Sequence, residues 1–501
     1  MNTHYYIHGQ FIQAQDPNGE WVAKSPADLS DVLGTIRYSY RAVEDAVTSA
    51  RQAIPGWRKK SFFERAEFIK KYQDAIKRRS VELTKLLAKE VGKPLWESEL
   101  EIKQTLEIID FFLEKKTYSS VDEIEVSDPL PGSAGFHRQK PLGVVAVISP
   151  FNTPAKISSA HMIPALMTGN TVIHKPSEKA TLFSLMLAEC IHEAGFPPGV
   201  YNLVAGDKEV GRRLSAHEGV QAVFFAGSYD TGLRIKQETL QQYWKFLALE
   251  MGGKNPMIVC KDAAIESALQ AAIVGAFMST GQRCSATSRI LVERSLMDEF
   301  VSKFHAASKR FSIDHPLKNP FMGPLIDALS VDRFLKFHAI AIREGGEFVM
   351  RGKTLELEKQ GHYVTPAVCR FKDYTADALK KSVFHQTEFF APMVSLIPFD
   401  DLDHALSLAG ASQYGLVASV FTQSKETFEQ AYEQLEYGMI YWNKATVGSS
   451  NRLPYGGWKK SGNHRPMGSE APIHCMASVA VLHAQPESGA GQNYPGLNWQ
   501  K

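Results

Sequence analysis

Long apolar segments are missing from this sequence of 501 residues. The longest apolar run, at residues 144–148, is far shorter than the roughly 20 residues that a membrane-spanning helix needs. The first residues, MNTHYYIHGQFIQ, contain no basic start followed by an apolar segment, so no signal peptide is predicted. We therefore expect a cytoplasmic protein without a membrane partner.

A large excess of one charge is also missing. The 56 Lys and Arg residues nearly balance the 54 Asp and Glu residues, which gives a formal net charge of +2. Dedicated nucleic-acid-binding proteins usually carry a strong basic excess, so nucleic acid is not an expected partner. Hydrophobic residues make up 44% of the chain and charged residues 22%, which is typical of globular proteins and excludes overall disorder.

Cysteine is scarce and widely spaced. The five cysteines are Cys190, Cys260, Cys284, Cys369 and Cys475, and the closest two are 24 positions apart. This spacing excludes a CxxC pair, a zinc ribbon and a dense disulfide scaffold. We expect reduced thiols, most of them buried, and the open question is whether one of them is a nucleophile.

Several signatures of catalytic sites are absent as well. There is no H-E-x-x-H and no cluster of His and Cys at ligand spacing, so no metal site is predicted. The lack of G-x-S-x-G disfavours a serine hydrolase. No G-x-G-x-x-G occurs, and Leu233 follows Gly232 where a Walker A loop requires lysine.

What the chain does contain is an alternation of short apolar runs and helical periodicity. Amphipathic helices are expected at 62–91 and 96–115. Strands are then expected at 143–148, 170–174, 200–204, 222–225, 256–260, 288–292, 393–399, 416–421 and 439–442. The helices between them are expected at 180–194, 207–215, 230–242, 264–279, 296–310, 401–409 and 424–435. This pattern predicts two α/β domains with a ligand cleft at the carboxyl ends of their strands.

Two segments carry residue types suited to acyl chemistry. Cys284 lies in the glycine turn GQRCS between an apolar helix and a strand, where free backbone N–H groups could stabilise a thiolate. Asn152 lies in the proline-locked loop SPFNTP, which suits an oxyanion donor. For each segment an ordinary structural role, a buried cysteine or a turn asparagine, remains an alternative.

Two further segments suit a base and a phosphate group. Glu250 precedes two glycines after a short apolar run, so its carboxylate could face a cleft, although most Glu residues are simply solvated. Gly227 and Ser228 follow a strand, and Gly232 lies one turn into the next helix. Glycines and a helix N-terminus let a backbone approach an anion, and an ordinary strand-to-helix turn is the alternative.

Together these four segments, in their order and spacing, resemble the aldehyde dehydrogenase superfamily. That family pairs E-x-G-G-K with G-Q-x-C, and here Glu250 and Cys284 are 34 positions apart, as in the family. Further matching segments are KPSE at 175–178, GFPPGV at 195–200, EFFAP at 388–392 and PYGG at 454–457. The resemblance covers residues from about 5 to 485.

The resemblance implies a fold and an assembly. It implies an α/β protein with a Rossmann-like NAD-binding domain at residues 1–119 and 141–254 and an α/β catalytic domain at 255–440. A small β oligomerisation arm is implied at 120–140 and 468–485, together with homodimers or homotetramers. These boundaries and the oligomeric state come from the family likeness and not from periodicity.

The resemblance also implies roles for single residues. Cys284 is similar to the family's nucleophile, Asn152 to its oxyanion donor and Glu250 to the base that activates water. The implied cofactor-binding residues are Ser149, Pro150, Phe151, Lys175, Ser177, Glu178, Gly206, Phe225, Gly227, Ser228, Gly232, Met251, Gly252, Glu388 and Phe390. A carboxylate at position 178 accepts hydrogen bonds from a ribose 2′-hydroxyl and repels a 2′-phosphate, so NAD is expected rather than NADP.

Within the superfamily the chain looks most like the N-succinylglutamate 5-semialdehyde dehydrogenase branch of arginine catabolism. The matching stretches include SGNHRP at 461–466, Cys475 and the tail segment PGL at 495–497. The implied substrate is a small acidic semialdehyde, with Arg283, Ser285, Ser449, Ser450 and Arg465 as candidate substrate-binding residues. Trp458 and Lys459 stand where that branch has small residues, so the mouth of the site could differ.

Three alternatives remain open at this stage. The chain could oxidise glutamate semialdehyde or another aldehyde, since the departures from the branch concern the substrate and not the chemistry. It could transfer the acyl group to CoA instead of water, but Glu250 argues against this because acyl transfer to CoA needs no water-activating base. It could also be a binding protein on the same fold, which the joint presence of Cys284, Glu250 and Asn152 disfavours.

Overall fold

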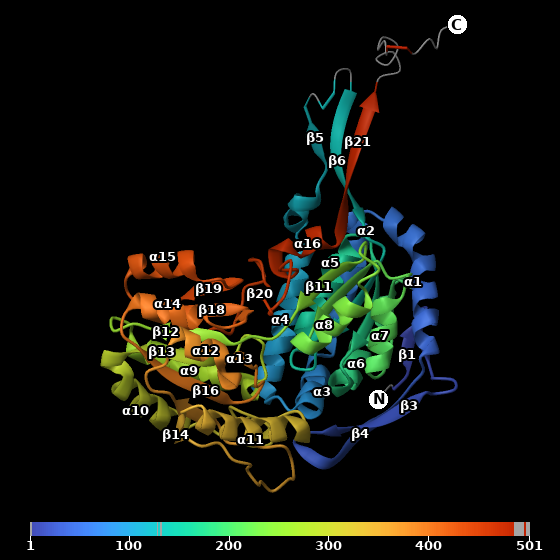
Figure 1. The fold of residues 1–501 in the computed structure, drawn as a ribbon. Helices are drawn as coiled ribbons and strands as arrows, with labels where there is room; N and C mark the ends of the chain where they lie inside the picture. Colours follow the sequence, from blue (N-terminus) through green and yellow to red (C-terminus); the bar gives the residue numbers. More distant parts are fainter. Residues whose placement is uncertain (1–2, 128, 131–132, 485–494, 497–501) are drawn as a thin grey trace.

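The computed structural model describes residues 3–127, 129–130, 133–484 and 495–496. Two α/β bodies lie side by side, and a narrow arm projects from one of them (Figure 1). Each body is built around one seven-stranded sheet, and the arm around a three-stranded sheet. The α/β class expected from the sequence, with its Rossmann-like and second α/β units, is therefore confirmed.

The first sheet has the strand order β11-β10-β7-β8-β9-β1-β2. Its strands are β1 (Tyr5–Ile7), β2 (Gln10–Ile12), β7 (Val144–Ser149), β8 (Thr171–Pro176), β9 (Tyr201–Leu203), β10 (Ala222–Ala226) and β11 (Phe246–Glu250). Strands β7 to β11 are parallel, and β7, β8 and β10 are buried along their whole length. The order reverses between β7 and β10, and such a switch point opens a crevice for ligands.

Helices cover both faces of the first sheet. They are α1 (Arg41–Lys59), α2 (Phe62–Arg78), α3 (Ser80–Val91), α4 (Leu95–Leu113), α5 (Pro154–Met167), α6 (Thr181–Glu193), α7 (Lys208–Ala216) and α8 (Tyr229–Glu238). Helix α5 packs on β7 and β8, α1 on β8 and β9, and α4 packs against α5. Helix α5 is buried along nearly its whole length, with Lys156 and Ile157 the half-buried exceptions, so it lies deep in the core rather than at the surface.

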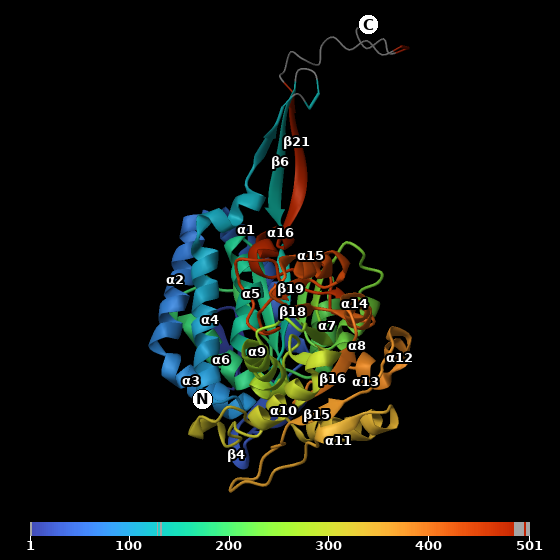
Figure 2. The same ribbon diagram turned by 90° about the vertical axis from the view of Figure 1, so that its left-hand side faces the viewer.

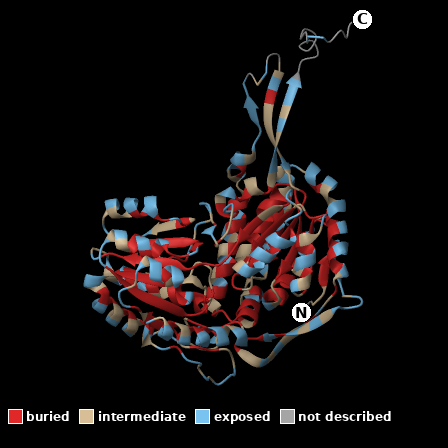
Figure 3. Ribbon diagram, viewed as in Figure 1, coloured by how far each residue is buried: buried red, intermediate tan, exposed pale blue. Residues whose placement is uncertain are grey.

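The second sheet has the order β14-β15-β16-β13-β12-β18-β19 and is parallel except at β14. Its strands are β12 (Asn255–Val259), β13 (Thr287–Glu293), β14 (Glu347–Met350), β15 (Ala367–Arg370), β16 (Met393–Phe399), β18 (Val417–Phe421) and β19 (Met439–Trp442). The helices are α9 (Ile265–Phe277), α10 (Met297–Ser308), α11 (Ala328–Arg343), α12 (Ala376–Lys381), α13 (Val383–Gln386), α14 (Leu402–Gly410) and α15 (Lys425–Gln434). Buried residues fill both sheets and the faces that the helices turn toward them (Figure 3).

The arm stands away from both bodies (Figure 2). It consists of β5 (Ile124–Val126), β6 (Ser133–Pro141) and β21 (Met476–Ala484), with β6 in the middle. At its base, α16 (Ala471–His474) packs on the 3-10 helix Lys115–Val121. The remaining strands are the hairpin of β3 (Gly19–Ser25) and β4 (Asp28–Tyr38) and the pair β17 (Tyr414–Gly415) and β20 (Trp458–Lys459).

Several boundaries differ from the sequence expectations. The expected helix 62–91 is two helices, interrupted at Arg79, whose side chain forms ion pairs with Glu189 and Glu193 of α6. A break of one residue hardly changes the three- and four-residue spacing of the apolar positions, so helical periodicity does not reveal it. Helix α8 ends at Glu238 and not at 242, and the chain continues in turns in which the Gln242 N–H bonds to the Thr239 carbonyl at 2.9 Å. The elements that were not expected are strands β1 to β4, helices α1 and α5, strand β11, helix α11, strands β14 and β15 and the short helices α12 and α13.

Some sequence expectations fall outside the described residues. These are residues 1 and 2 of the expected cofactor domain, residues 128, 131, 132 and 485 of the expected arm, and Leu497 of the tail segment. The domain boundaries and the oligomerisation role of the arm stay predictions. No helix in the described part of the chain is long and apolar enough to cross a membrane.

Candidate active site

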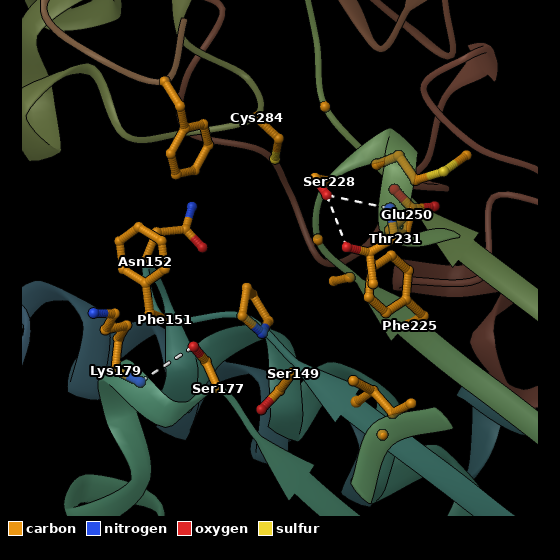
Figure 4. Close-up of a pocket in the computed structure, with 18 of the residues that line it drawn as sticks. Ser149, Phe151, Asn152, Ser177, Lys179, Phe225, Ser228, Thr231, Glu250 and Cys284 are labelled. Carbon is orange, nitrogen blue, oxygen red and sulfur yellow. Dashed lines mark hydrogen bonds between the residues drawn. The ribbon is translucent and has the colours of Figure 1, made fainter. Parts of the chain in front are cut away.

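A cavity of about 710 Å³ opens at the carboxyl ends of the first sheet and is closed by loops of the second body. Its walls include almost all of the residues expected to bind a cofactor; the two exceptions are Gly206 and Gly232. At both positions a larger residue would clash with a neighbouring side chain. A Cβ on Gly206 would lie 2.2 Å from Val210, and one on Gly232 would lie 2.5 Å from the Met251 sulfur. Figure 4 shows the thiol of Cys284 and the amide of Asn152 directed into the same space.

Cys284 follows a backbone turn that only tertiary contacts can hold. Ser279 and Thr280 have φ values of 56° and 57°, a left-handed conformation that costs about 1–3 kcal/mol for each such residue. The Ser279 N–H bonds to Glu97 at 3.0 Å, and the Thr280 hydroxyl bonds to the Gly323 carbonyl at 3.0 Å. The turn places the half-buried Cys284 at the cavity, whereas the other four cysteines are buried.

Burial raises the pKa of the Cys284 thiol to about 11. A hydrogen bond with the Tyr455 hydroxyl, at 3.4 Å from the sulfur, lowers this pKa, and the positive charge of Arg283 lowers it further. The carboxyl groups of Glu388 and Glu250 act in the opposite direction. The pKa of Tyr455 is itself raised well above its ordinary value by burial, so its hydroxyl stays protonated and can donate to the sulfur.

A buried charge cluster ties the cysteine turn to the asparagine loop. The cluster consists of Lys93, Glu97, Glu101 and Arg283, of which the first three side chains are almost fully buried. Glu97 accepts from the Arg283 guanidinium at 2.7 Å, and Lys93 bonds to Glu101. Glu101 also accepts from the Ala155 N–H at 2.9 Å, at the start of α5. Helix α4 therefore holds both catalytic segments at once.

The burial of Glu97 would raise its pKa, but its partners outweigh this effect. The charges of Arg283 and Lys93 and the hydrogen bond from Ser279 lower the pKa below its ordinary value, so Glu97 stays ionised. Arg283 was expected to bind substrate, and it does line a cavity beside Cys284. Its guanidinium, however, is already bonded to Glu97 and to the Ser279 hydroxyl. Its role toward a substrate stays a prediction.

Asn152 follows β7 and is buried. Its amide nitrogen donates one hydrogen bond to the Gln282 carbonyl at 2.9 Å, two residues before Cys284. The second N–H of this amide has no partner among the described residues and is free for a ligand oxygen. The geometry suits stabilisation of negative charge on an oxygen whose carbon is bonded to the Cys284 sulfur.

Glu250 ends β11 and is buried at the cavity wall. Its Oε1 atom has no hydrogen-bond partner among the described residues. Burial raises the pKa of this carboxyl well above its ordinary value, and the charge of Arg465 opposes the shift. A Cβ on Gly456 would lie 2.4 Å from Oε1, so only glycine at that position leaves room for the carboxylate. A buried, unpaired acceptor with a raised pKa is suited to take a proton from water.

The far end of the large cavity has the features of a nucleotide site. Ser228 caps α8, and it lines the cavity together with Gly227 and Thr231, so the N-terminus of this helix lies at the cavity wall. Lys175 is buried, and its ammonium lies 3.5 Å from the half-buried carboxylate of Glu178. Carboxylates and a lysine beside a helix N-terminus fit the hydroxyls and the pyrophosphate of a dinucleotide.

The wall between this end and Cys284 carries Glu388. Its carboxylate accepts from the Gly253 N–H at 3.0 Å, and burial raises its pKa to about 7. A Cβ on Gly252 would lie 2.1 Å from the same carboxylate, so a larger residue at position 252 would clash with Glu388. Phe390, with a φ of 55°, packs edge-to-face on Phe151 at 5.8 Å. The residues present therefore fit a nicotinamide dinucleotide that extends toward Cys284.

A second, smaller cavity of about 50 Å³ lies on the other side of Cys284. Of the expected substrate-binding residues, Arg283, Ser285, Ser449 and Ser450 line it. Arg465 lines neither cavity; it is exposed, and its charge acts on Glu250. Trp458 and Lys459 form β20 and also line neither cavity.

Two residues of this second cavity were missed by the sequence reasoning. Tyr455 belongs to the matching segment PYGG, but no role was assigned to it. Lys156 lies only four positions after Asn152, and this nearness in the sequence was the available signal. Both line the second cavity together with Asn152 and Cys284.

Comparison with known proteins agrees with the fold. Residues 12–481 match the profile of the Aldehyde dehydrogenase family. N-succinylglutamate 5-semialdehyde dehydrogenase of Novosphingobium aromaticivorans is 32% identical over 94% of this chain and 98% of its own. Alpha-ketoglutaric semialdehyde dehydrogenase of Bacillus subtilis is 34% identical over 97% of this chain and 99% of its own.

A solved structure gives the same result. Betaine aldehyde dehydrogenase of Staphylococcus aureus, in complex with NAD+, is 28% identical and superposes with a TM-score of 0.91 over 96% of this chain and 97% of the other. The family match spans most of the chain, and the relatives exceed 30% identity over nearly its whole length. This chain belongs to the aldehyde dehydrogenase family and is an oxidoreductase that acts on aldehydes.

Proposed function

We propose that this enzyme oxidises an acidic semialdehyde to the corresponding carboxylate with NAD, and that its substrate is N-succinylglutamate 5-semialdehyde. The observation that carries the proposal is the convergence of Cys284, Asn152 and Glu250 on one cavity. These three side chains come from two loops and from the end of β11, and they supply a thiol, an amide donor and an unpaired carboxyl group. The reaction product is N-succinylglutamate, in arginine catabolism.

The first step is addition of the thiol to the aldehyde. The Cys284 sulfur gives its proton to water and forms a bond to the carbonyl carbon, whose oxygen becomes the oxyanion of a thiohemiacetal. The carbonyl oxygen takes up negative charge and is stabilised by the free N–H of Asn152 and the backbone N–H of Cys284. A single donor of this kind is worth about 2.7–4 kcal/mol in comparable sites.

NAD, when bound in the large cavity, supplies the acceptor for the hydride that leaves the substrate carbon. The Cys284 sulfur then carries the acyl group as a thioester. Glu250 takes a proton from water, the oxygen of this water bonds to the thioester carbon, and the carbon–sulfur bond breaks. The raised pKa of Glu250 makes it a stronger base than an ordinary carboxylate, because proton affinity rises with pKa.

The cofactor site favours NAD. The residues that would hold it are Lys175 and Glu178 at the adenine-side ribose, Gly227 and Ser228 at the pyrophosphate, and Glu388 at the nicotinamide-side ribose. The negative charge of Glu178 would repel a 2′-phosphate at this position. The S. aureus relative was solved with NAD+, which agrees with this assignment.

A second candidate substrate is alpha-ketoglutaric semialdehyde. The B. subtilis relative with this name is 34% identical to the chain. The specific observation in its favour is the volume of about 50 Å³ in the second cavity, which suits a short acid better than the longer N-succinylglutamate chain. No such observation favours glutamate semialdehyde as the substrate or CoA as the acyl acceptor. The Oε1 atom of Glu250, which has no hydrogen-bond partner among the described residues, argues against acyl transfer to CoA.

We propose a division of the chain that follows the sheets. Residues 1–119 and 141–254 form the cofactor unit, residues 255–440 the catalytic unit, and residues 120–140 and 468–485 an arm through which two or four copies assemble. In support, the strands of the first sheet all precede Met251, and those of the second sheet all follow Lys254. The arm strands β5, β6 and β21 pair only with one another.

NADH formation across a panel of aldehydes tests the function. The panel contains N-succinylglutamate, alpha-ketoglutaric, glutamate and succinic semialdehydes and the neutral aldehyde hexanal, with the Cys284→Ala variant as blank. We expect the highest kcat/KM with one of the first two substrates. A preference for hexanal would contradict an acidic substrate, and acyl-CoA formation after addition of CoA would contradict hydrolysis. A lack of NADH with every aldehyde would overturn the proposed function itself.

A further inference from the structure

Lys156 lies in the first turn of α5 and lines the small cavity next to Cys284. Its backbone N–H is fixed by the Glu101 carboxylate at 3.3 Å. Its ammonium contacts the Ser449 hydroxyl at 3.5 Å, across the cavity from α5. The backbone of Lys156 is therefore held in place, and its side chain extends across the small cavity to Ser449.

The charge of Lys156 is not balanced by the protein. Among the described residues no carboxylate lies within ion-pair distance of its ammonium. The charged groups that act on it are Arg283 and Lys93, which repel it, and Glu101 and the Cys284 thiol, which attract it in their ionised forms. Glu101 is already committed to Lys93 and to two backbone N–H groups of α5.

Lys156 and the buried charge cluster together contain one more positive charge than negative charges. The cations are Lys93, Arg283 and Lys156, and the carboxylates are Glu97 and Glu101. An unpaired charge in a partly buried place is costly unless a ligand brings the opposite charge. The cavity beside Lys156 also offers the hydroxyls of three serines, Ser285, Ser449 and Ser450, as further hydrogen-bond donors.

We propose that Lys156 binds the carboxylate of the substrate while the aldehyde carbon lies at Cys284. This inference rests on the proposed function and names the group that recognises the acid. Because the two ends of the substrate would be held by residues that line the same small cavity, the cavity selects for the distance between carboxylate and aldehyde. A semialdehyde that carries a carboxylate fits this arrangement, and a neutral alkanal gains nothing from the ammonium.

The protonation state of Lys156 supports a pH-dependent preference. Burial, and next the charge of Arg283, lower the pKa of Lys156 to about 8. Below this pH the free enzyme carries the ammonium, and above it the amine is neutral. The kcat/KM for an acidic semialdehyde should therefore fall as the pH rises through about 8, whereas the kcat/KM for hexanal should not follow this transition.

The experiment compares Lys156→Met and Lys156→Arg with the wild type on succinic semialdehyde and on hexanal. We expect Lys156→Met to lower the ratio of kcat/KM for succinic semialdehyde to that for hexanal by roughly ten- to a hundredfold, the value of one charged hydrogen bond. Lys156→Arg keeps the charge and should restore most of this ratio. Lys103→Met, which changes an exposed lysine of α4, is the matched control.

Two outcomes would overturn the inference. One is an equal loss on both substrates in Lys156→Met, which would make the lysine a structural residue. The other is a pH profile for succinic semialdehyde that is the same in Lys156→Met and in the wild type. Both differ from failure of the proposed function, in which the wild type itself would form no NADH with either aldehyde.

Discussion

Glu97 and Arg283 are 186 positions apart in the chain, yet the carboxylate of the first accepts from the guanidinium of the second at 2.7 Å. Glu97 is fully buried, and the same carboxylate bonds to the left-handed Ser279. This contact explains how a strained turn is kept in place directly before Cys284. It also shows that Arg283, which looks like a substrate-binding cation in the sequence, forms a structural ion pair.

Replacement of Glu97 by Gln should destabilise the protein. The change leaves the buried charges of Lys93 and Arg283 with one partner fewer, and loss of one member of a buried pair costs about 3–5 kcal/mol. The measurement is urea-induced unfolding followed by fluorescence. Glu20→Gln is the control, because Glu20 pairs with Arg37 at the exposed surface, where such a pair is worth only about 0–1 kcal/mol. Equal stability of both variants would contradict the role of Glu97.

Replacement of Tyr455 by Phe should make Cys284 less reactive. The tyrosine hydroxyl lowers the pKa of the thiol, so its loss raises this pKa and leaves less thiolate at pH 8. We expect alkylation by iodoacetamide to slow by roughly three- to tenfold, and its pH profile to shift upward. The other four cysteines are buried, and Cys284→Ala corrects for any reaction with them. An unchanged pH profile would exclude Tyr455 as the donor.

Replacement of Glu250 by Gln should separate the two halves of the reaction. Hydride transfer does not need the carboxylate, so a burst of about one NADH per active site should precede slow turnover. The steady-state rate should fall by roughly 10²–10⁴-fold, as expected for loss of a general base. In the wild type kcat should rise with pH as the Glu250 carboxyl loses its proton, and this limb should vanish in Glu250→Gln. Slow turnover without a burst would contradict the assignment.

Replacement of Glu178 by Ala should weaken the preference for NAD. Removal of one negative charge beside the expected ribose should raise kcat/KM with NADP by roughly tenfold, which corresponds to ~1.4 kcal/mol. NAD should bind less well to the same variant, because a ribose hydroxyl loses its acceptor. Glu429→Ala, an exposed position on α15, serves as the control. A wild type that already prefers NADP would show that Glu178 does not set the choice.

Charged residues on the arm should disrupt assembly. Ile124 and Leu482 are large hydrophobic residues with 55% and 54% of their surface exposed on β5 and β21. If the arm joins copies of this chain, Ile124→Asp with Leu482→Asp should convert a dimer or tetramer to a smaller species in analytical ultracentrifugation. Leu240→Asp, at a residue that is 73% exposed beyond α8, should leave the mass unchanged. An unchanged mass for the arm variant would contradict the oligomerisation role.

The sequence predicted much of the fold because local patterns specify it. Buried parallel strands such as β7 and β10 appear as continuous apolar runs, and helices such as α6 appear between them with their start and stop residues. The break at Arg79 and the early end of α8 were missed, because neither changes the local spacing of apolar residues enough to be seen. Strands β1 and β2 are too short to leave a periodic signal.

The sequence alone determined the α/β class, the order of the elements and the family, because these depend on local periodicity and on motif spacing along the chain. Only the tertiary structure decided which charges are free. The sequence indicated Arg283 as a substrate-binding cation and gave no role to Lys156, but folding pairs Arg283 with a glutamate 186 positions away and leaves Lys156 without a carboxylate partner among the described residues. Charge pairing depends on distance in space, and a linear sequence does not contain that distance.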